Sequence, residues 1–242
     1  MPSSEDDIVE ILQTNKVKRD RAIKIANKLL NLGEVEYLAK GTSFVVLLLR
    51  TPEGDRRVVK IEKDDITASG AACKEAHFLR IANSIGVGPR LYSYDHDLRY
   101  LITEYFDGEF IIDFLLREKD AEKIRKTVIS ALMDAFRLDE LGITHKELAS
   151  PKRHIIVTNE GPKFIDFEKC SKSKKPKNLS QLVQFFFLNP KSPFRGKIFS
   201  IFGLKDDDVN KLVELIREYK RTEKKSEIFR RILQILGHSG PI

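Results

Sequence analysis

The chain has 242 residues, which is enough to bury one core of ordinary size or two smaller ones. Hydrophobic residues make up 41% and charged residues 33%, and the charges are interspersed, so fibrous and disordered classes are excluded and a globular protein is indicated. No run approaches the roughly 20 apolar residues of a membrane helix, and the acidic N-terminus lacks a signal-peptide core. We therefore expect a cytoplasmic protein with no membrane partner.

Charge and cysteine content narrow the classes of partner. Lys and Arg outnumber Asp and Glu by 43 to 36, and this formal charge of +7 favours an anionic partner such as a nucleotide, an RNA or an acidic protein. The two cysteines, Cys73 and Cys170, are far apart and lack the spacing of metal ligands, so neither a disulfide framework nor a zinc site is indicated. We predict that both are buried thiols.

The first half of the chain predicts a small sheet with one inserted helix. Residues 5–32 carry apolar positions at helical spacing and indicate one or two helices before Gly33. Strand patterns on both sides of a Pro-Glu-Gly-Asp turn at residues 52–55 predict an antiparallel hairpin. A helical pattern then follows from residue 71, and two further strand-like stretches end at residue 106.

The second half is mainly helical. Residues 110–119 and 121–142 predict two helices, and residues 154–169 predict a hairpin of two short strands. A lysine-rich connector, an apolar helix over 179–188 and a break at 190–196 come next, followed by helices near 205–220 and 223–236. In the apolar helix, Phe185, Phe186 and Phe187 are expected in the core rather than on a stacking surface.

Several polar residues occur in an order that resembles the signature set of protein kinases. Lys60 ends a strand, Glu75 lies fifteen residues later in the next helix, and the sequences His-Lys-Glu-Leu (145–148) and Ile-Asp-Phe-Glu (165–168) follow. In that family a strand lysine, a helix glutamate, a hinge, a catalytic loop and a metal-binding aspartate come in the same order. The resemblance covers roughly residues 36–170. It is closer to the trimmed atypical kinases, which include the RIO kinases, the small kinase of the KEOPS tRNA-modification complex and the lipopolysaccharide-kinase group.

This resemblance implies an α+β, two-lobed protein-kinase-like fold. Residues 1–34 would form an N-terminal helical segment, and residues 35–107 an N-lobe with a small antiparallel sheet and one inserted helix. Residues 108–242 would form a reduced, mainly helical C-lobe. The resemblance further implies ATP as substrate and Mg²⁺ as cofactor.

The residue types suit the roles that the resemblance implies. Lys60 would contact the nonreacting phosphates of ATP, Glu75 would hold its ammonium group by an ion pair, and Asp166 would bind Mg²⁺ through hard oxygen atoms. Glu147 would be the catalytic base in the place of a kinase aspartate. Its extra methylene group moves the carboxylate by roughly 1 Å, which is a costly change in catalysis.

The nucleotide site would be completed by the first hairpin turn and the hinge. Gly41, with Thr42 and Ser43, would contact phosphate, although Gly41 is equally well explained as a simple hairpin turn. Backbone groups of the hinge, including those of Glu104 and Phe106, would meet adenine.

Two positions depart from the kinase pattern. Counting five residues from Glu147 places Lys152 where the metal-binding asparagine belongs, whereas alignment on the hairpin places His154 there. We prefer His154 as the second metal residue beside Asp166, although imidazole is a poorer Mg²⁺ ligand than an amide oxygen. Glu168 replaces a glycine and indicates a fixed loop or an additional acidic group. His145 is expected to be architectural.

We therefore predict an ATP-dependent phosphotransferase of the atypical serine/threonine kinase type, acting on a protein substrate or on itself. The alternative is a nucleotide-binding pseudokinase or slow ATPase that works as a switch or scaffold. A small-molecule kinase and a basic RNA-binding or structural protein are further alternatives. RNA or a ribonucleoprotein could bind through Lys172–Lys177, whose default interpretation is a solvated charge run.

Overall fold

The structure is a computed structural model that describes residues 4–65, 70–238 and 240. It is a mixed α+β protein, as the sequence predicts. Its contacts divide the chain into two compact units. We call residues 1–106 with 167–169 the sheet unit, and residues 107–166 with 170–242 the helical unit.

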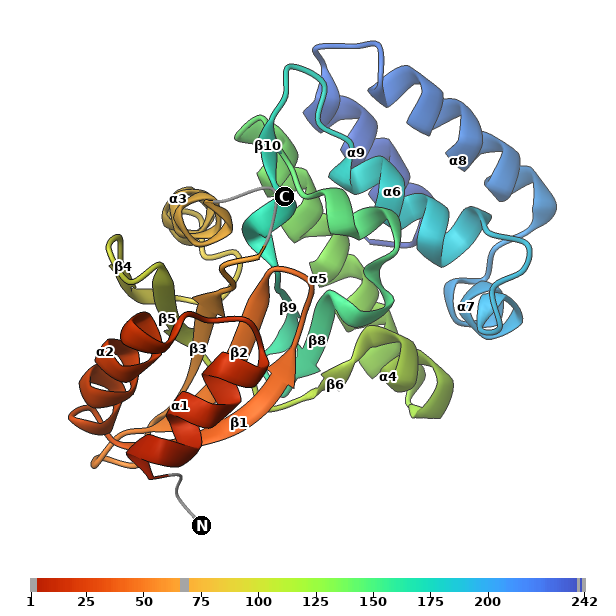
Figure 1. Cartoon of the computed structure of the whole chain (residues 1–242). Helices are drawn as coiled ribbons and strands as arrows, with labels where there is room; N and C mark the ends of the chain where they lie inside the picture. The colour runs from red at the N-terminus through yellow and green to blue at the C-terminus, as the bar shows by residue number, and fades with distance from the viewer. Residues whose placement is uncertain (1–3, 66–69, 239, 241–242) are drawn as a thin grey trace. The chain divides into compact units, whose positions relative to one another are not determined.

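The sheet unit contains a five-stranded antiparallel sheet with the order β1-β2-β3-β5-β4 (Figure 1). The strands are β1 (Glu34–Lys40), β2 (Phe44–Arg50), β3 (Arg56–Glu62), β4 (Leu91–Asp95) and β5 (Tyr100–Glu104). The predicted hairpin turn is present, since Thr51 N donates to Asp55 O at 2.9 Å and Gly54 has a left-handed φ of +90°. This φ value explains the glycine in the turn.

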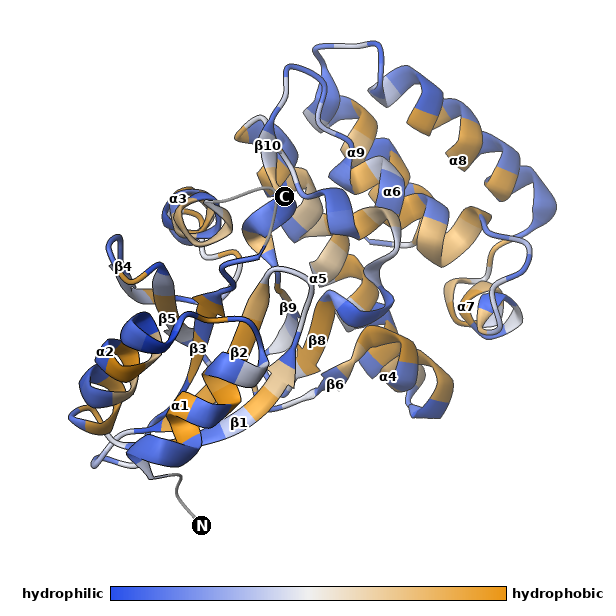
Figure 2. Ribbon diagram, viewed as in Figure 1, coloured by the Kyte–Doolittle hydropathy of each residue, from blue (hydrophilic) through white to orange (hydrophobic). Residues whose placement is uncertain are grey.

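Two helices, α1 (Glu5–Thr14) and α2 (Arg19–Leu30), cover one face of this sheet. A capping box at Ser4 begins α1, and Lys16 with a φ of +68° separates the two helices. Their apolar sides share a core with β2, β3 and β5, and the mixed character of both helices can be followed in Figure 2. The N-terminal segment therefore packs within the sheet unit.

Helix α3 (Ala71–Asn83) buries the side that carries Ala72, Glu75, Ala76 and Leu79. Cys73 lies on the opposite side of α3 and is exposed, so the prediction of two buried thiols is wrong for Cys73 and correct for Cys170. A helix has one buried stripe, and position 73 lies outside it.

A short 3₁₀ helix, η3 (Phe167–Lys169), packs against α3 in the sheet unit. The Phe167 ring is fully buried beside Gly88. Gly88 has a φ of +78°, and a Cβ atom there would come within 2.8 Å of this ring. The close approach therefore requires glycine at position 88.

The helical unit is built around the long helix α5 (Ala121–Glu140). The buried stripe of α5 includes Ile124, Val128, Leu132 and Phe136, and the Phe136 ring stacks on Phe229 at 4.5 Å between centroids. The other helices are α4 (Ile111–Arg117), η1 (Lys146–Ala149), η2 (Pro151–Arg153), α6 (Asn178–Val183), η4 (Gln184–Leu188), α7 (Arg195–Phe202), α8 (Asp206–Tyr219) and α9 (Lys225–Ile235).

Short strands complete the helical unit. They are β6 (Glu109–Phe110), β7 (Ile143–Thr144), β8 (Ile155–Thr158), β9 (Gly161–Phe164) and β10 (Ser171–Lys172). Strands β8 and β9 form the predicted hairpin, with β6 on the other side of β8, and β7 pairs separately with β10.

The predicted apolar helix over 179–188 changes character along its length. Its first part is the α-helix α6, and its second part is the π-helical segment η4. Phe186 and Phe187 are buried and confirm the core prediction, whereas Phe185 is half-buried. Helix α7 was not predicted, because its start lies inside the expected break. None of the helices within the described residues is long and apolar enough to cross a membrane.

Candidate functional site

The sheet unit brings together Lys60 and Glu75. Side chains alternate along β3, so Val59 and Ile61 enter the core under α1 and α2 while Lys60 points to the opposite face. There its Nζ atom lies 2.7 Å from Oε1 of Glu75 on α3. The Lys60 and Glu75 side chains are 12% and 1% exposed, so this is a largely desolvated ion pair. Removing either partner would leave a buried charge, which is strongly unfavourable.

The turn between β1 and β2 carries Gly41, Thr42 and Ser43. Gly41 N donates to Phe44 O at 2.9 Å, and Lys63 Nζ donates to Gly41 O at 2.6 Å. Gly41 has no left-handed φ, and the nearest atom to a Cβ built there is 3.9 Å away. The local fold therefore has room for a side chain at position 41, and the turn itself does not require glycine.

The predicted hinge lies at the end of β5. Glu104 N donates to Arg90 O at 2.9 Å, and Arg90 N donates to a Glu104 carboxylate oxygen at 3.1 Å. The Glu104 side chain therefore ties β5 to the chain entering β4. Phe106 is half-buried and is the last residue of the main segment of the sheet unit. Adenine recognition by the backbone here stays a prediction.

The helical unit brings together Glu147, His154 and Asp166. His154 Nε2 lies 3.6 Å from a Glu147 carboxylate oxygen and 3.8 Å from an Asp166 carboxylate oxygen. Glu147 comes from η1, His154 from the start of the hairpin, and Asp166 from the residue pair that follows β9. These separations are too long for direct hydrogen bonds, but they place one imidazole beside two carboxylates.

The backbone around Asp166 is held in an unusual conformation. Asp166 has a φ of +67°, which is uncommon for a residue with a side chain. The preceding residue, Ile165, is bonded on both sides: its N–H donates to His154 O, and its carbonyl accepts from His145 Nε2, both at 3.0 Å. Such conformations persist where surrounding contacts enforce them, and they are frequent at functional sites.

His145 has structural contacts that agree with an architectural role. It is fully buried, and burial lowers its pKa to about 4, so the imidazole is neutral at pH 7. Since Ile165 O can only accept, the proton must be on Nε2. The backbone N–H of His145 donates to the side-chain oxygen of Asn178 at 2.8 Å.

A buried polar network that the sequence reasoning missed supports the Glu147 turn. Asn178 Nδ2 donates to Ile143 O at 2.6 Å and to Asp139 Oδ1 at 2.8 Å. Asp139 also accepts from the Tyr219 hydroxyl at 2.8 Å, and burial raises the pKa of Asp139 to about 6. The sequence signal that could have indicated this network was Asn178 itself, an asparagine at the start of a helix after a lysine-rich run.

The donor set partly fits a divalent cation. The carboxylates of Glu147 and Asp166 are 19% and 35% exposed and offer the hard oxygen atoms that Mg²⁺ prefers. The imidazole of His154 suits Mn²⁺ and other transition metals better. Within the residues that the structure describes, no three His, Cys, Asp or Glu side chains are already arranged around one ion position.

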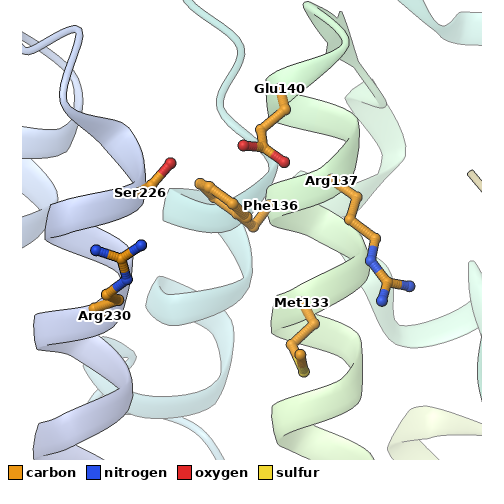
Figure 3. A pocket seen from close by; sticks show the side chains of 6 residues that line it. All are labelled: Met133, Phe136, Arg137, Glu140, Ser226 and Arg230. Atoms are coloured by element: carbon orange, nitrogen blue, oxygen red, sulfur yellow. The ribbon is translucent and has the colours of Figure 1, made fainter. Parts of the chain in front are cut away.

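Several hollows in the helical unit lie outside this cluster, among them one on α5 and α9 and one beside η1. A hollow of 220 Å³ is lined by Met133, Phe136, Arg137 and Glu140 of α5 and by Ser226 and Arg230 of α9. Figure 3 shows these side chains, with those of the two helices on opposite sides of the view. This hollow contains none of the residues predicted for the nucleotide or the metal. A second hollow of 350 Å³ is lined by Ala149, Gln181, Gln184, Phe185, Leu188, Asn189 and Pro190. It adjoins the turn that carries Glu147.

The lysines of the predicted RNA-contacting run are solvated. Lys172, Lys174, Lys175 and Lys177 are all exposed, whereas Pro176 between them is buried. The run begins at β10, which pairs with β7. Exposure of all four ammonium groups fits both a solvated surface and an electrostatic contact with a polyanion.

The comparisons with known proteins include a similarity over about half of this chain. No protein-family model matches the chain. An uncharacterized protein from Methanocaldococcus jannaschii is 28% identical over 118 residues, which cover 49% of this chain and 98% of that protein. Nearly the whole of that archaeal protein therefore corresponds to about half of this chain, and its name describes no activity.

Proposed function

We propose that this chain is an ATP-dependent phosphotransferase of the atypical serine/threonine protein kinase type. The observation that carries the proposal is the desolvated ion pair between Lys60 and Glu75. A lysine on a central strand, held by a buried glutamate from the helix next to the sheet, is a rigid cation suited to the phosphates of a nucleotide. A buried ion pair adds little to the stability of a protein, because the cost of desolvating both charges offsets much of their attraction. Stability alone therefore does not explain this pair.

The fold supports the proposal in outline. A five-stranded antiparallel sheet with one helix, α3, inserted between β3 and β4 precedes a mainly helical unit in the chain. This order is similar to that of the two lobes of protein kinases. The proposed fold is therefore a reduced kinase-like one, preceded by the helices α1 and α2.

The proposed roles follow from the chemistry of each side chain. Lys60 would bind the nonreacting phosphates, and Thr42 and Ser43, in the turn beside Gly41, would contact phosphate oxygens. Asp166 and Glu147 are the oxygen donors available to Mg²⁺, which would neutralise charge on the phosphates. The second hollow, beside Ala149, would receive the acceptor segment.

In the transfer step, Glu147 would accept the proton of the acceptor hydroxyl. The hydroxyl oxygen forms a bond to the γ-phosphorus while the bond from that phosphorus to the bridging oxygen of ADP breaks, so ADP leaves with the electron pair. Positioning of the nucleotide by Lys60 and of the base by the η1 turn are the contributions of this chain.

The alternative is a nucleotide-binding pseudokinase, and one observation favours it. His154 lies within 3.6 Å of Glu147, where its imidazole competes for the carboxylate that would act as base. A protonated His154 would hold that carboxylate as an ion pair. Nucleotide binding without transfer is the result that this alternative predicts.

Label transfer from radiolabelled ATP tests the proposal. Purified chain would be incubated with Mg²⁺, alone and with generic acceptor proteins, beside Lys60→Ala and Asp166→Ala. The matched controls are Lys24→Ala and Asp113→Ala, because both residues are exposed and lie in the same two units. We expect the site variants to lose at least about 90% of transfer and the controls to keep it.

Two outcomes contradict the proposal in different ways. Transfer that survives both site substitutions removes the assignment of Lys60 and Asp166. A rise in melting temperature with ATP, without any transfer to protein or water, supports the pseudokinase instead.

The second candidate partner is RNA at Lys172–Lys177. Four exposed lysines in one short run favour it. Replacing all four with Gln should reduce both RNA affinity and the slope of affinity against salt concentration. Unchanged binding at low and high salt would remove this surface as an RNA contact.

A further inference from the structure

The last residue of β3, Glu62, is a fully buried carboxylate that nothing in the sequence reasoning assigned. Its Oε1 atom accepts a hydrogen bond from Gly70 N at 3.2 Å, and its Oε2 atom accepts one from Ala72 N at 2.9 Å. Both donors belong to the N-terminus of α3. Gly70 is the N-cap residue and has no side chain of its own to accept such bonds. Glu62 therefore caps α3 from a different element of the fold.

The Glu62 carboxylate pairs with one arginine, Arg99. Arg99 lies 3.1 Å from Glu62 Oε1 and also pairs with Asp64. Arg99 has a left-handed φ of +47°, and its carbonyl accepts from Glu62 N at 3.0 Å. Backbone and guanidinium of Arg99 thus both hold the same glutamate.

Helix α2 joins this group through Arg21. The guanidinium of Arg21 donates to the Glu62 carbonyl and lies 2.8 Å from Asp64 Oδ1, and Lys18 N donates to Asp64 Oδ2 at 2.7 Å. The Arg21 and Asp64 side chains are only 10% and 13% exposed. The N-terminal helices are therefore linked by buried charges to the strand end that caps α3.

Glu62 and the proposed nucleotide-binding pair lie on one face of β3. Lys60 and Glu62 are two residues apart, so both point to the side of the sheet where α3 lies. On α3, Ala72 and Glu75 are three residues apart and share the buried face. Strand and helix therefore meet twice: Glu62 holds the first turn of α3, and Lys60 meets Glu75 one turn later.

We propose that Glu62 is the positioning residue for the Lys60–Glu75 ion pair, and that the N-terminal helices control this pair through Arg21. A helix held at its first turn cannot rotate or slide along the strand, so the Glu75 carboxylate stays within hydrogen-bond distance of Lys60. An effect of this positioning on catalysis rests on the proposed function. The positioning of α3 by Glu62 does not, because it exists in the protein without nucleotide.

The chemistry of the position argues for more than packing. An apolar side chain would fill the same space without the cost of burying a carboxylate. The buried charge is instead directed at the amide groups of a helix N-terminus, where the helix dipole favours a negative charge. A residue that positions a site can strongly affect its reaction rate, since a displacement of about 1 Å at a site can lower the rate a hundredfold.

Hydrogen exchange on the whole chain without nucleotide tests the positioning. Glu62→Gln keeps the shape and removes the charge, and Glu62→Ala removes both. The matched control is Glu36→Gln, because Glu36 is a partly exposed glutamate of β1 whose partner is Arg50. We expect amide exchange at Ala72 and Lys74 to accelerate about tenfold or more in the Glu62 variants, while α5 keeps its protection.

Two results of this experiment would overturn the proposal. One is wild-type protection of the α3 amides in Glu62→Ala. The other is an equal loss of protection in α1, α2 and α3, which would mean that Glu62 only stabilises the unit as a whole. If Glu62→Ala does not fold, the comparison of Glu62→Gln with Glu36→Gln decides between these results.

Control by the N-terminal helices is tested with Arg21→Gln beside Arg19→Gln, since Arg19 is exposed on the same helix. Arg21→Gln should accelerate exchange in the first turn of α3, and Arg19→Gln should not. A wild-type exchange pattern in Arg21→Gln would overturn this part of the proposal.

Nucleotide binding then separates this proposal from the proposed function. If wild-type protein binds ATP with Mg²⁺, the Glu62 variants should bind about tenfold more weakly and Glu36→Gln should not change. Looser α3 amides with unchanged ATP affinity would overturn the link to the site. If wild-type protein binds no ATP, the proposed function fails, while the exchange results still decide the role of Glu62.

Discussion

Replacing Asn178 with alanine is the most informative perturbation of the helical unit. The Asn178 side chain accepts from His145 N and donates to Ile143 O and Asp139 Oδ1. All four groups are buried, and alanine can replace none of these hydrogen bonds. The substitution therefore removes the contacts that hold the chain two residues before Glu147.

The magnitude follows from the groups that lose their partner. A buried donor or acceptor deprived of its hydrogen bond costs about 1–3 kcal/mol, and Asp139 keeps its bonds from the backbone and from Tyr219. Two strongly affected groups, Ile143 O and His145 N, give a loss of roughly 2–6 kcal/mol in the free energy of unfolding. For a chain of this length, the melting temperature should fall by about 10 °C.

Calorimetry and denaturant titration measure this loss, with Asn210→Ala as control because Asn210 is an exposed amide in α8 of the same unit. Where transfer activity is present, kcat should fall about tenfold, since the turn that carries Glu147 loosens, while ATP affinity changes little. A loss below about 1 kcal/mol for Asn178→Ala would refute the reasoning, because the buried groups would then have found other partners.

Four further predictions address other parts of the molecule. Gly41→Ala should leave the melting temperature unchanged, since there is room for a methyl group, but should weaken ATP binding at least about fivefold if phosphate approaches this turn; equal affinity in a binding titration would restore the simple hairpin interpretation. Gly88→Ala should destabilise by roughly 2–4 kcal/mol in urea unfolding, because its methyl group would meet the Phe167 ring at 2.8 Å in a left-handed backbone, and a wild-type midpoint would contradict this. His154→Asn should shift the preference of metal binding from Mn²⁺ toward Mg²⁺ in calorimetric titrations; an unchanged ratio of the two affinities would exclude His154 as a ligand. The pKa of Asp139 is raised from 3.8 to about 6, so its protonated form favours the folded state; the advantage of wild type over Asp139→Asn in unfolding free energy should therefore grow by roughly 3 kcal/mol as pH falls from 7 to below 4, and a flat difference would show that the carboxyl group is not perturbed.

The sequence by itself determined the elements whose causes are local. The apolar pattern of β2 and β3 and the Gly54 turn between them depend on neighbours in the chain, as does the buried stripe of α5. The order of strand lysine, helix glutamate and later acidic residues was also visible, and the structure places Lys60 and Glu75 in contact. Their chemical roles stay predictions.

Only the tertiary structure decided which polar groups are buried together. In the sequence, Glu62 is a charged residue at a strand end and Asn178 follows a lysine run, and neither position indicates burial. Both are buried because distant segments enclose them. Strands β6, β7 and β10 have two residues each, too few to produce a pattern, and exist through pairing with distant strands. A polar side chain can be buried at low cost only when hydrogen-bond partners surround it, and here those partners come from distant parts of the chain. Which polar residues are buried is therefore set by the tertiary structure.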